Sequence, residues 1–226
     1  MKCCTCLNKT VAWVECALNM VQQKLSFLGL FGLRLYLAPI MIAAGLNKLN
    51  SFDSTAQWFG NAEWGLGLPF PEVLAGLAIS AELVGGFALL LGFLTRLVAI
   101  PLMVTMLVAA FAVHWENGWY AIAPSNPATS TSAPLASVGF PGAAESLENS
   151  AEVGKRLTAA QTLLKEHGDY EWLTEKGTFV ALNNGIEFAA TYFLMLLMLF
   201  FYGGGKYLSI DYYLACWWRC QTKEAQ

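Results

Sequence analysis

Charge is what this sequence has least of. Only 13% of its 226 residues are Asp, Glu, Lys or Arg, whereas 56% are hydrophobic, and an average soluble domain carries about 25% charged residues. No run of Lys or Arg occurs and the formal net charge is -3, so the basic patch that nucleic-acid binding requires is missing and we exclude a nucleic-acid partner. The apolar residues form long blocks, which predict an all-α integral membrane protein.

Several familiar motifs are also missing. The sequence contains no P-loop, no His-Glu-x-x-His and no nucleophile elbow, which disfavours a soluble enzyme of a familiar kind. The first residues lack the order of a cleavable signal peptide because Lys9, Glu15 and Lys24 interrupt it, so we expect the N-terminus to be retained. Whether the protein is an enzyme stays open, and if it is, a membrane oxidoreductase subunit is the expected type.

Four stretches are apolar enough and long enough to cross a bilayer. At 1.5 Å per residue they measure about 26 to 36 Å, against a hydrocarbon core of about 30 Å. Backbone polar groups in lipid must pair within their own segment, so we predict a bundle of four helices. The predicted spans are residues 27–49, 71–94, 97–114 and 186–202. Thr95 and Arg96 form the predicted link between the second and third spans.

Basic residues in the short flanks predict the orientation. They precede the first span, follow the second and follow the fourth, and they are Lys2, Lys9, Lys24, Arg96, Lys206, Arg219 and Lys223. With four spans all of them lie on one side, which the positive-inside rule assigns to the cytoplasm. We therefore expect both termini to be cytoplasmic and the long loop, residues 115–185, to lie outside.

The segments around the four-span domain, residues 27–202, have their own patterns. Residues 1–26 are Cys-rich and amphipathic, which favours an interfacial helix; the alternative is a straight extension of the first span. Residues 203–226 are rich in Tyr and Trp, as interfacial tails are. In the loop, an uncharged first part predicts irregular linker and residues 150–167 predict a short amphipathic helix. No second soluble domain is expected.

Ionisable residues in or beside the spans are the candidate site residues, because burying them in a bilayer is costly. Lys48, His114 and Glu187 fall at the predicted outer boundary, and Glu82 lies about 16 Å along the second span. Small residues at helical offsets from Glu82 indicate that it points into the bundle. We expect His114 and Glu187 to approach each other, with Lys48 beside them and Glu82 deeper.

These four residues allow three interpretations. They could form ion pairs that only fix which helices touch. They could serve as proton relays in redox or quinone chemistry, for which His and Glu are suited. They could also bind a divalent metal, since imidazole and carboxylate are common ligands.

Two other groups lie toward the predicted cytoplasmic side. We expect Arg34 to form a structural ion pair with Asp211. Cys3, Cys4 and Cys6 are candidate ligands for a soft ion such as Cu(I), which thiolates favour, although a cluster at a chain end can also have no function.

Longer strings of residues resemble a known family. The chain resembles the DoxX-like family of bacterial inner-membrane proteins in GLRLYLAPIMIAAGLNKL, ELVGGFALLLGFLTRL, MLVAAFAVHWENGW and NNGIEFAATYFLMLLMLFFYGGGKYLSIDY. Arg34, Lys48, Glu82, Arg96, His114, Glu187 and Asp211 occupy the family's polar positions. Two further strings resemble the HvfX group within it, WFGNAEWGLGLPFPE and EWLTEKGTFVALNNGIEF. The Cys-rich N-terminus lies outside the resemblance.

The resemblance implies a four-helix protein of the bacterial inner membrane. Relatives are associated with membrane redox complexes, and the HvfX group with maturation or handling of copper-binding, ribosomally made peptides. The expected function is thus an accessory factor in the maturation, handling or export of such a peptide. Expected partners are lipid, membrane or peptide-modifying proteins and a small Cys-rich peptide. The alternatives are a quinone-coupled redox subunit and a non-catalytic scaffold; quinone and copper are the cofactors considered.

Overall fold

The computed structural model describes residues 2–224, with side chains described for residues 11–222. Within that range every named element is a helix, and the isolated antiparallel bridge between Ile122 and Leu182 is no strand. The all-α prediction is therefore confirmed. The chain divides into two compact units, each described by itself: the bundle unit, Met1–Val108 with Ala190–Gln226, and the loop unit, Ala109–Ala189.

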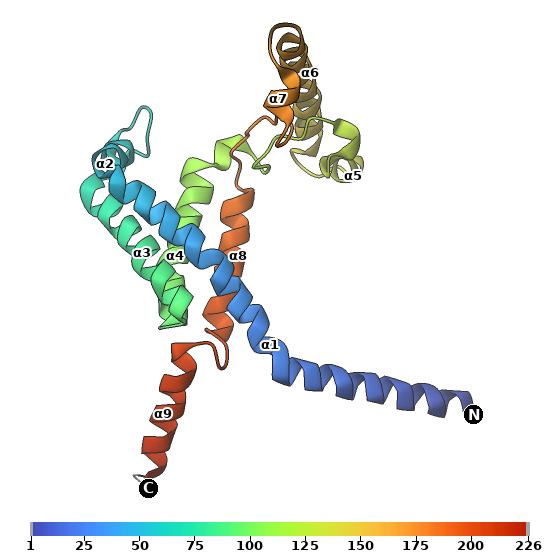
Figure 1. Ribbon diagram of the computed structural model, residues 1–226, viewed down its shortest axis with the longest axis vertical. Coiled ribbons are helices and arrows are strands. Elements are labelled where there is room, and N and C mark those ends of the chain that lie inside the picture. Colours follow the sequence, from blue (N-terminus) through green and yellow to red (C-terminus); the bar gives the residue numbers. More distant parts are fainter. Residues whose placement is uncertain (1, 225–226) are drawn as a thin grey trace. The chain divides into compact units, whose positions relative to one another are not determined.

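Long helices build the bundle unit (Figure 1). They are α1 (Lys2–Asn50), α2 (Phe52–Gly60), α3 (Pro71–Leu91), α4 (Thr95–Val108), most of α8 (Glu187–Tyr202) and α9 (Ile210–Glu224). Three helical stretches in the described residues are long and apolar enough to cross a membrane, Val11–Asn50, Pro71–Leu91 and Thr95–Val113. They overlap the first three predicted spans, which are therefore helices that could cross a membrane.

Helix α8 is shorter than the other predicted spans. It is apolar and has 16 residues, which corresponds to about 24 Å against a hydrocarbon core of about 30 Å. The fourth crossing, and the orientation that depends on it, therefore stay predictions.

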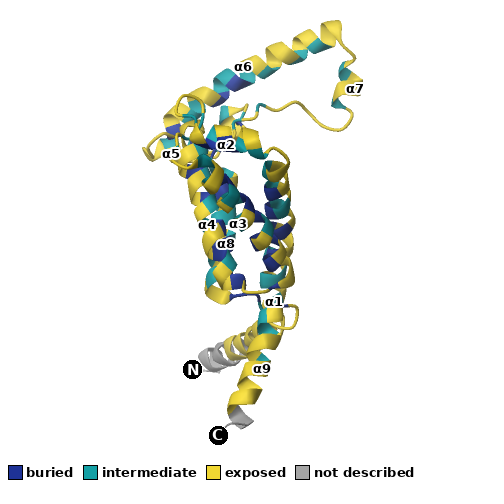
Figure 2. Cartoon of the chain, turned by 90° about the vertical axis from the view of Figure 1, so that its left-hand side faces the viewer, coloured by how far each residue is buried: buried dark blue, intermediate teal, exposed yellow. Residues whose placement is uncertain are grey.

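The bundle unit buries one side of each long helix and exposes the other. Its core consists of Leu37, Ala38, Met41, Leu89, Leu102, Met106, Leu196 and Leu199, and Figure 2 shows the buried positions along the inner faces of α1, α3, α4 and α8. Many large apolar side chains on these helices are exposed, among them Leu77, Val84, Leu97, Val104 and Leu194. An apolar exposed surface of this extent is typical of contact with lipid or another protein.

The turn between α3 and α4 differs from the predicted link. Helix α3 ends at Gly92, which has the left-handed φ of 65° that glycine adopts without a steric penalty. The turn continues through Leu94, also with a positive φ. Thr95 is already the first residue of α4, so the prediction that Thr95 and Arg96 form the link was wrong. The glycine ends α3 three residues before the predicted end of that span.

Helix α1 runs without interruption from Lys2 to Asn50. The predicted amphipathic N-terminal segment is thus helical and continuous with the first span. Its apolar residues are exposed, including Trp13 and Leu18. Whether this segment lies on a membrane surface stays a prediction.

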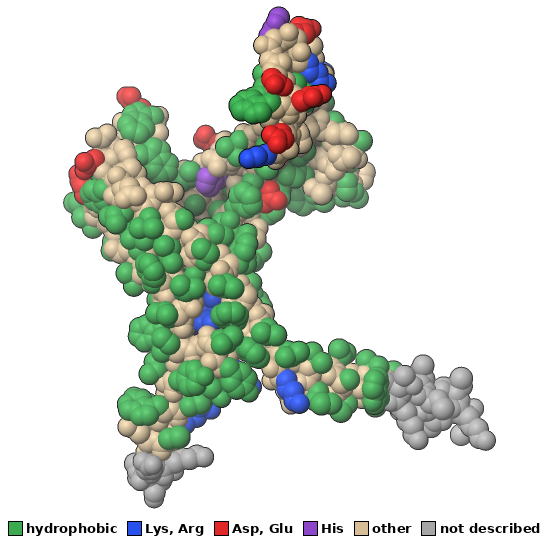
Figure 3. Space-filling view, viewed as in Figure 1, with side chains coloured by type: hydrophobic (Ala, Val, Ile, Leu, Met, Phe, Trp, Pro, Cys, Tyr) green, Lys and Arg blue, Asp and Glu red, His purple; other side chains and the backbone are tan. Residues whose placement is uncertain are grey.

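The loop unit is more ordered than an irregular linker. It contains a π-helical turn (Ala109–Val113), two 3₁₀ turns (Trp115–Asn117 and Pro127–Thr129), α5 (Ser132–Ser137), α6 (Ala143–His167) and α7 (Tyr170–Thr174). Helix α6 confirms the predicted helix and begins seven residues earlier. Figure 3 shows acidic and basic side chains gathered over α6 and α7, in contrast to the green surface of the long helices.

Candidate functional site

The bundle unit holds an ion pair between α1 and α3. The Lys48 ammonium Nζ lies 2.7 Å from both Glu82 Oε1 and Oε2 and donates a hydrogen bond to each. The Glu82 side chain is 4% exposed and the Lys48 side chain is 31% exposed. The prediction that Glu82 points into the bundle is confirmed, and its partner is Lys48.

Small residues make room for this pair. Gly85 and Gly86, which follow Glu82 on the same helix face, are buried, and a Cβ on Gly86 would lie 2.7 Å from Ile42 Cγ1. On the opposite helix, a Cβ on Gly45 would lie 3.2 Å from the Glu82 Cβ. Glycine at these positions lets α1 and α3 approach closely enough for the lysine to reach the carboxylate.

The pair combines a buried acceptor with a partly accessible donor. A buried carboxylate is expensive unless a charge and hydrogen bonds compensate it, and here one ammonium does both. Lys48 is the more exposed partner, so it is the member of the pair that solvent or a ligand reaches first. This chemistry suits a proton relay or a gate that opens when a substrate replaces one partner.

His114 and Glu187 belong to the loop unit, where they bind backbone groups. His114 Nδ1 lies 2.8 Å from the carbonyl oxygen of Asn184, and Glu187 Oε2 accepts a hydrogen bond of 3.0 Å from the Ala121 N–H. The two contacts fasten residues 114–123 to residues 181–187, two segments that also share backbone hydrogen bonds. The two residues thus help to close the base of the long loop.

The contact also indicates which nitrogen of the His114 ring carries the hydrogen. A carbonyl oxygen only accepts hydrogen bonds, so Nδ1 carries the hydrogen in this geometry, and in the neutral ring Nε2 is the basic atom. The preceding π-helical turn is closed by a bond from the His114 N–H to the Ala109 carbonyl. Such turns insert an extra residue and redirect the side chain that follows.

The predicted four-residue constellation is distributed over both units. Lys48 and Glu82 meet within the bundle unit, whereas His114 and Glu187 lie in the loop unit. Direct approach of His114 to Glu187, and of either residue to Lys48, stays a prediction.

Arg34 and Asp211 lie around the same turn, at Gly92, but bind backbone groups. Arg34 is fully buried and its Nη2 donates to the Leu208 carbonyl. The two Asp211 carboxylate oxygens accept from the Leu94 N–H at 2.7 Å and the Thr95 N–H at 2.9 Å. Asp211 therefore caps α4. A Coulombic interaction links it to Arg34, although the pair is not among the salt bridges of the described residues.

Metal ligands do not gather in the part of the chain that the structure describes, where no group of three or more His, Cys, Asp or Glu side chains converges. The candidate copper ligands Cys3, Cys4 and Cys6 have side chains outside the described residues. Copper binding at these thiols stays a prediction.

Sequence reasoning missed the residues that organise the loop base. Asn183 donates from Nδ2 to the Asn117 and Tyr120 carbonyls, and Asn184 has a left-handed φ of 57°. A Cβ on Gly185 would lie 2.5 Å from the Tyr120 oxygen, so only glycine fits. The Asn-Asn-Gly string is itself a turn signal that could have indicated this role.

Comparison with known proteins gives one match. Residues 29–115 match the sequence model of the family described as DoxX. This stretch contains Arg34, Lys48, Glu82, Arg96 and His114, and it ends before Glu187 and Asp211. No curated protein and no solved structure matches the chain. Over residues 29–115, which include the Lys48–Glu82 pair, the chain is therefore similar to the membrane proteins of the DoxX family.

Proposed function

We propose that this protein belongs to the DoxX family and is an accessory membrane factor in the maturation, handling or export of a copper-binding, ribosomally made peptide. Its working site is the Lys48–Glu82 pair. Copper enters this proposal as cargo of the peptide. The single observation that carries the choice of site is the hydrogen-bonded pair, buried at the carboxylate and accessible at the ammonium.

The energetics of the pair support a functional role. Two well-packed apolar side chains would hold α1 against α3 at no desolvation cost, since replacing a buried ion pair with hydrophobic residues is often neutral or stabilising. Ionisable residues within membrane segments more often belong to pathways or relays for protons, ions and substrates. A peptide carrying thiols or carboxylates could displace one partner and bind the other.

The first string that carries the narrower resemblance to the HvfX group folds as a turn in the bundle unit, and membership of that group stays a prediction. Residues 58–72 form a closed turn after α2, in which the Leu66 and Leu68 N–H groups bond to the Trp58 and Phe59 carbonyls. A Cβ on Gly65 would lie 1.9 Å from the Trp58 oxygen, so glycine is required there. The resembling residues thus specify a defined turn within the bundle unit.

The test is a gene deletion in the native host, complemented with wild type, Lys48→Met, Glu82→Gln or the control Lys155→Met. The mass, copper content and location of any small Cys-rich peptide encoded nearby are then compared. We expect the deletion and both pair variants to leave the peptide immature or undelivered, and the control to restore it. A fully mature, delivered peptide in the deletion strain would refute the proposal.

A quinone-coupled redox subunit is the second candidate, favoured by the ionisable Lys48–Glu82 pair, because ionisable residues in membrane segments often belong to proton relays. In that case quinone should co-purify with the wild-type protein, and its reduction should depend on Glu82. The third candidate, a scaffold, predicts that the double variant Lys48→Met with Glu82→Met, in which stability recovers, also recovers function.

The proposed orientation can be tested separately by labelling single-cysteine variants with an impermeant thiol reagent. With four spans and both termini in the cytoplasm, a cysteine at the exposed position 128 of the long loop should react in cells with a permeabilised outer membrane. Cys220 should react only after the inner membrane is broken. The reverse pattern would show that the orientation is inverted, and labelling of both sites from outside would indicate an odd number of crossings.

A further inference from the structure

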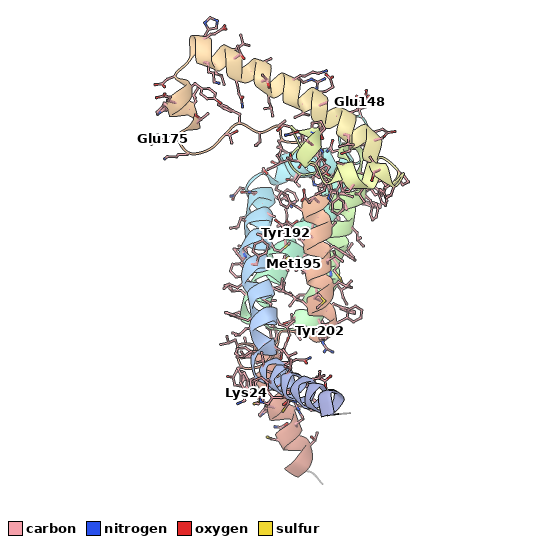
Figure 4. All side chains as sticks on the ribbon, turned by 90° about the vertical axis from the view of Figure 1, so that its right-hand side faces the viewer. Lys24, Glu148, Glu175, Tyr192, Met195 and Tyr202 are labelled. Carbon is pink, nitrogen blue, oxygen red and sulfur yellow. The ribbon has the colours of Figure 1, made fainter. Side chains whose placement is uncertain are left out.

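A cavity of about 840 Å³ opens in the bundle unit where several helices end. Its wall is formed by the N-terminal half of α1, the start of α4, the loop after α8 and the first turns of α9. Figure 4 labels Tyr202 at this end of α8 and Lys24 on the nearby part of α1. The cavity is remote from Lys48 and Glu82, neither of which lines it.

The charges on the cavity wall favour an anion. Arg96 and Lys206 line the cavity together with one carboxylate, Asp211. That carboxylate is already engaged, because both of its oxygens accept backbone N–H groups of the α4 terminus. Neither Arg96 nor Lys206 forms a salt bridge within the described residues. Two cations are therefore available to a ligand.

A glycine loop adds backbone donors beside these cations. Gly203 and Gly205 have left-handed φ values of 74° and 86°, so the chain turns sharply along the cavity wall. A Cβ on Gly203 would lie 3.3 Å from Arg96 Nε, which places that guanidinium against the loop. Across the described residues, the N–H groups of Gly204, Gly205 and Lys206 donate to no backbone carbonyl. Successive backbone N–H groups in such turns form anion-binding concavities.

The remaining wall is amphipathic. Asn19, Gln22, Gln23 and Ser26 lie three or four positions apart along α1 and present polar side chains, whereas Phe27, Leu30 and Leu97 are apolar. The cavity also lies at the ends of two candidate spans, since Pro71–Leu91 ends and Thr95–Val113 begins beside it. In a bilayer, span ends lie at headgroup level, where basic pockets between helices bind anionic lipid headgroups.

We propose that this cavity binds the phosphodiester headgroup of an anionic phospholipid. Arg96 and Lys206 hold the phosphate oxygens, the glycine loop donates backbone N–H groups, and the acyl chains leave along the apolar wall. A guanidinium presents a planar fork of donors that matches phosphate, and the lysine adds a point charge. The proposal is independent of the function of the Lys48–Glu82 pair.

Native mass spectrometry of the full chain in detergent tests it, with phosphatidylglycerol and phosphatidylcholine of identical acyl chains as probes. We expect phosphatidylglycerol to bind at least about tenfold more tightly, and the preference to weaken as salt rises. Arg96→Gln and Lys206→Gln should each reduce phosphatidylglycerol binding about tenfold. Lys24→Gln removes the same charge from α1 outside the cavity and should leave binding unchanged.

Three results would overturn the proposal. One is equal binding of both lipids by the wild-type protein, which requires no variant to fold. Another is an undiminished phosphatidylglycerol preference in Lys206→Gln, whose side chain has no described intrachain partner and whose melting temperature serves as the folding check. The last is stabilisation by millimolar inorganic phosphate with none by phosphatidylglycerol, which would identify a free phosphate site instead of a lipid site.

Discussion

Between α1 and α3 of the bundle unit two charged side chains bind each other, whereas at the base of the long loop polar side chains bind the backbone. Lys48 and Glu82 bind each other directly, but Glu187 binds the Ala121 N–H and His114 binds the Asn184 carbonyl. The long helices of the bundle unit pair their own backbone, so backbone groups there are open only near helix ends, where Arg34 and Asp211 bind them. The loop unit has open backbone groups, and its polar side chains are used to pair them.

A second ion pair, in the loop unit, sharpens this comparison. In the loop unit Lys155 and Glu152 also approach to 2.7 Å, but their side chains are 73% and 47% exposed. The distance is the same as for Lys48 and Glu82, so the two pairs differ mainly in burial. Burial decides what each pair contributes to stability, because water screens one pair and not the other.

The largest expected effect is loss of one member of the buried pair. Lys48→Met leaves the Glu82 carboxylate buried without its partner and should lower the free energy of unfolding by about 3–5 kcal/mol. Lys155→Met, the matched exposed change, should cost less than about 1 kcal/mol. Thermal unfolding in detergent compares them, and equal shifts would contradict the role of burial. The double variant Lys48→Met with Glu82→Met should recover most of the loss.

A smaller effect is expected at the cap of α4. Asp211→Ala removes the acceptor of two N–H groups at that helix terminus and should cost about 1–2 kcal/mol. Asp211→Asn keeps one side-chain oxygen and should cost less. Hydrogen exchange of the Leu94 and Thr95 amides measures the effect locally. Unchanged protection of both amides in Asp211→Ala would show that the cap does not form.

At the loop base we expect losses of about 1 kcal/mol per hydrogen bond. Glu187→Gln keeps an oxygen for the Ala121 N–H and should preserve its protection, whereas Glu187→Ala should expose that amide to faster exchange. His114→Gln and His114→Ala form a second such series at the Asn184 carbonyl. If the Gln variants abolish peptide maturation or redox function at normal stability, the loop base also has a working role. Full function in both Gln variants would exclude the loop base as a working site.

The smallest effect concerns Tyr120, whose hydroxyl lies within 3.4 Å of the hydroxyls of Ser130, Thr131 and Ser132. Burial raises the pKa of Tyr120, but hydrogen bonds from these hydroxyls outweigh it, and the pKa lies below its ordinary value of 10.0. Because the pKa of Tyr120 is lower in the folded state than in the unfolded state, the ionised side chain stabilises the fold. This contribution is fully present above pH 10.0, falls as the pH drops through the folded pKa, and is absent at neutral pH.

Tyrosinate absorbance checks this expectation. The difference between wild-type protein and Tyr120→Phe should show one tyrosine ionising earlier than a free tyrosine does. At neutral pH, Tyr120→Phe should cost no more than about 1 kcal/mol, from lost hydrogen bonds. A difference titration centred at or above the ordinary pKa would contradict the hydroxyl cluster.

Residue pattern alone determined the helical class, the helices of the first three predicted spans and the inward direction of Glu82. These follow from local rules, since a long apolar segment must pair its own backbone in lipid and small residues at helical spacing mark a packed face. Helix α6 was predicted in the same way from its apolar repeat. The pattern also singled out Lys48 and Glu82, which form an ion pair, because ionisable groups beside apolar spans are few in this chain.

Only the tertiary structure decided which partner each polar residue takes. Lys48 and Glu82 are 34 positions apart, Asp211 caps a helix that begins 116 positions earlier, and Glu187 binds a backbone group 66 positions away. The charges of the side chains indicate which groups can attract one another. They do not indicate which groups come within 3 Å of each other. That choice depends on where Gly45 and Gly86 let helices approach and where Gly92 and Gly185 turn the chain. Each of these positions is set by contacts between segments distant in sequence.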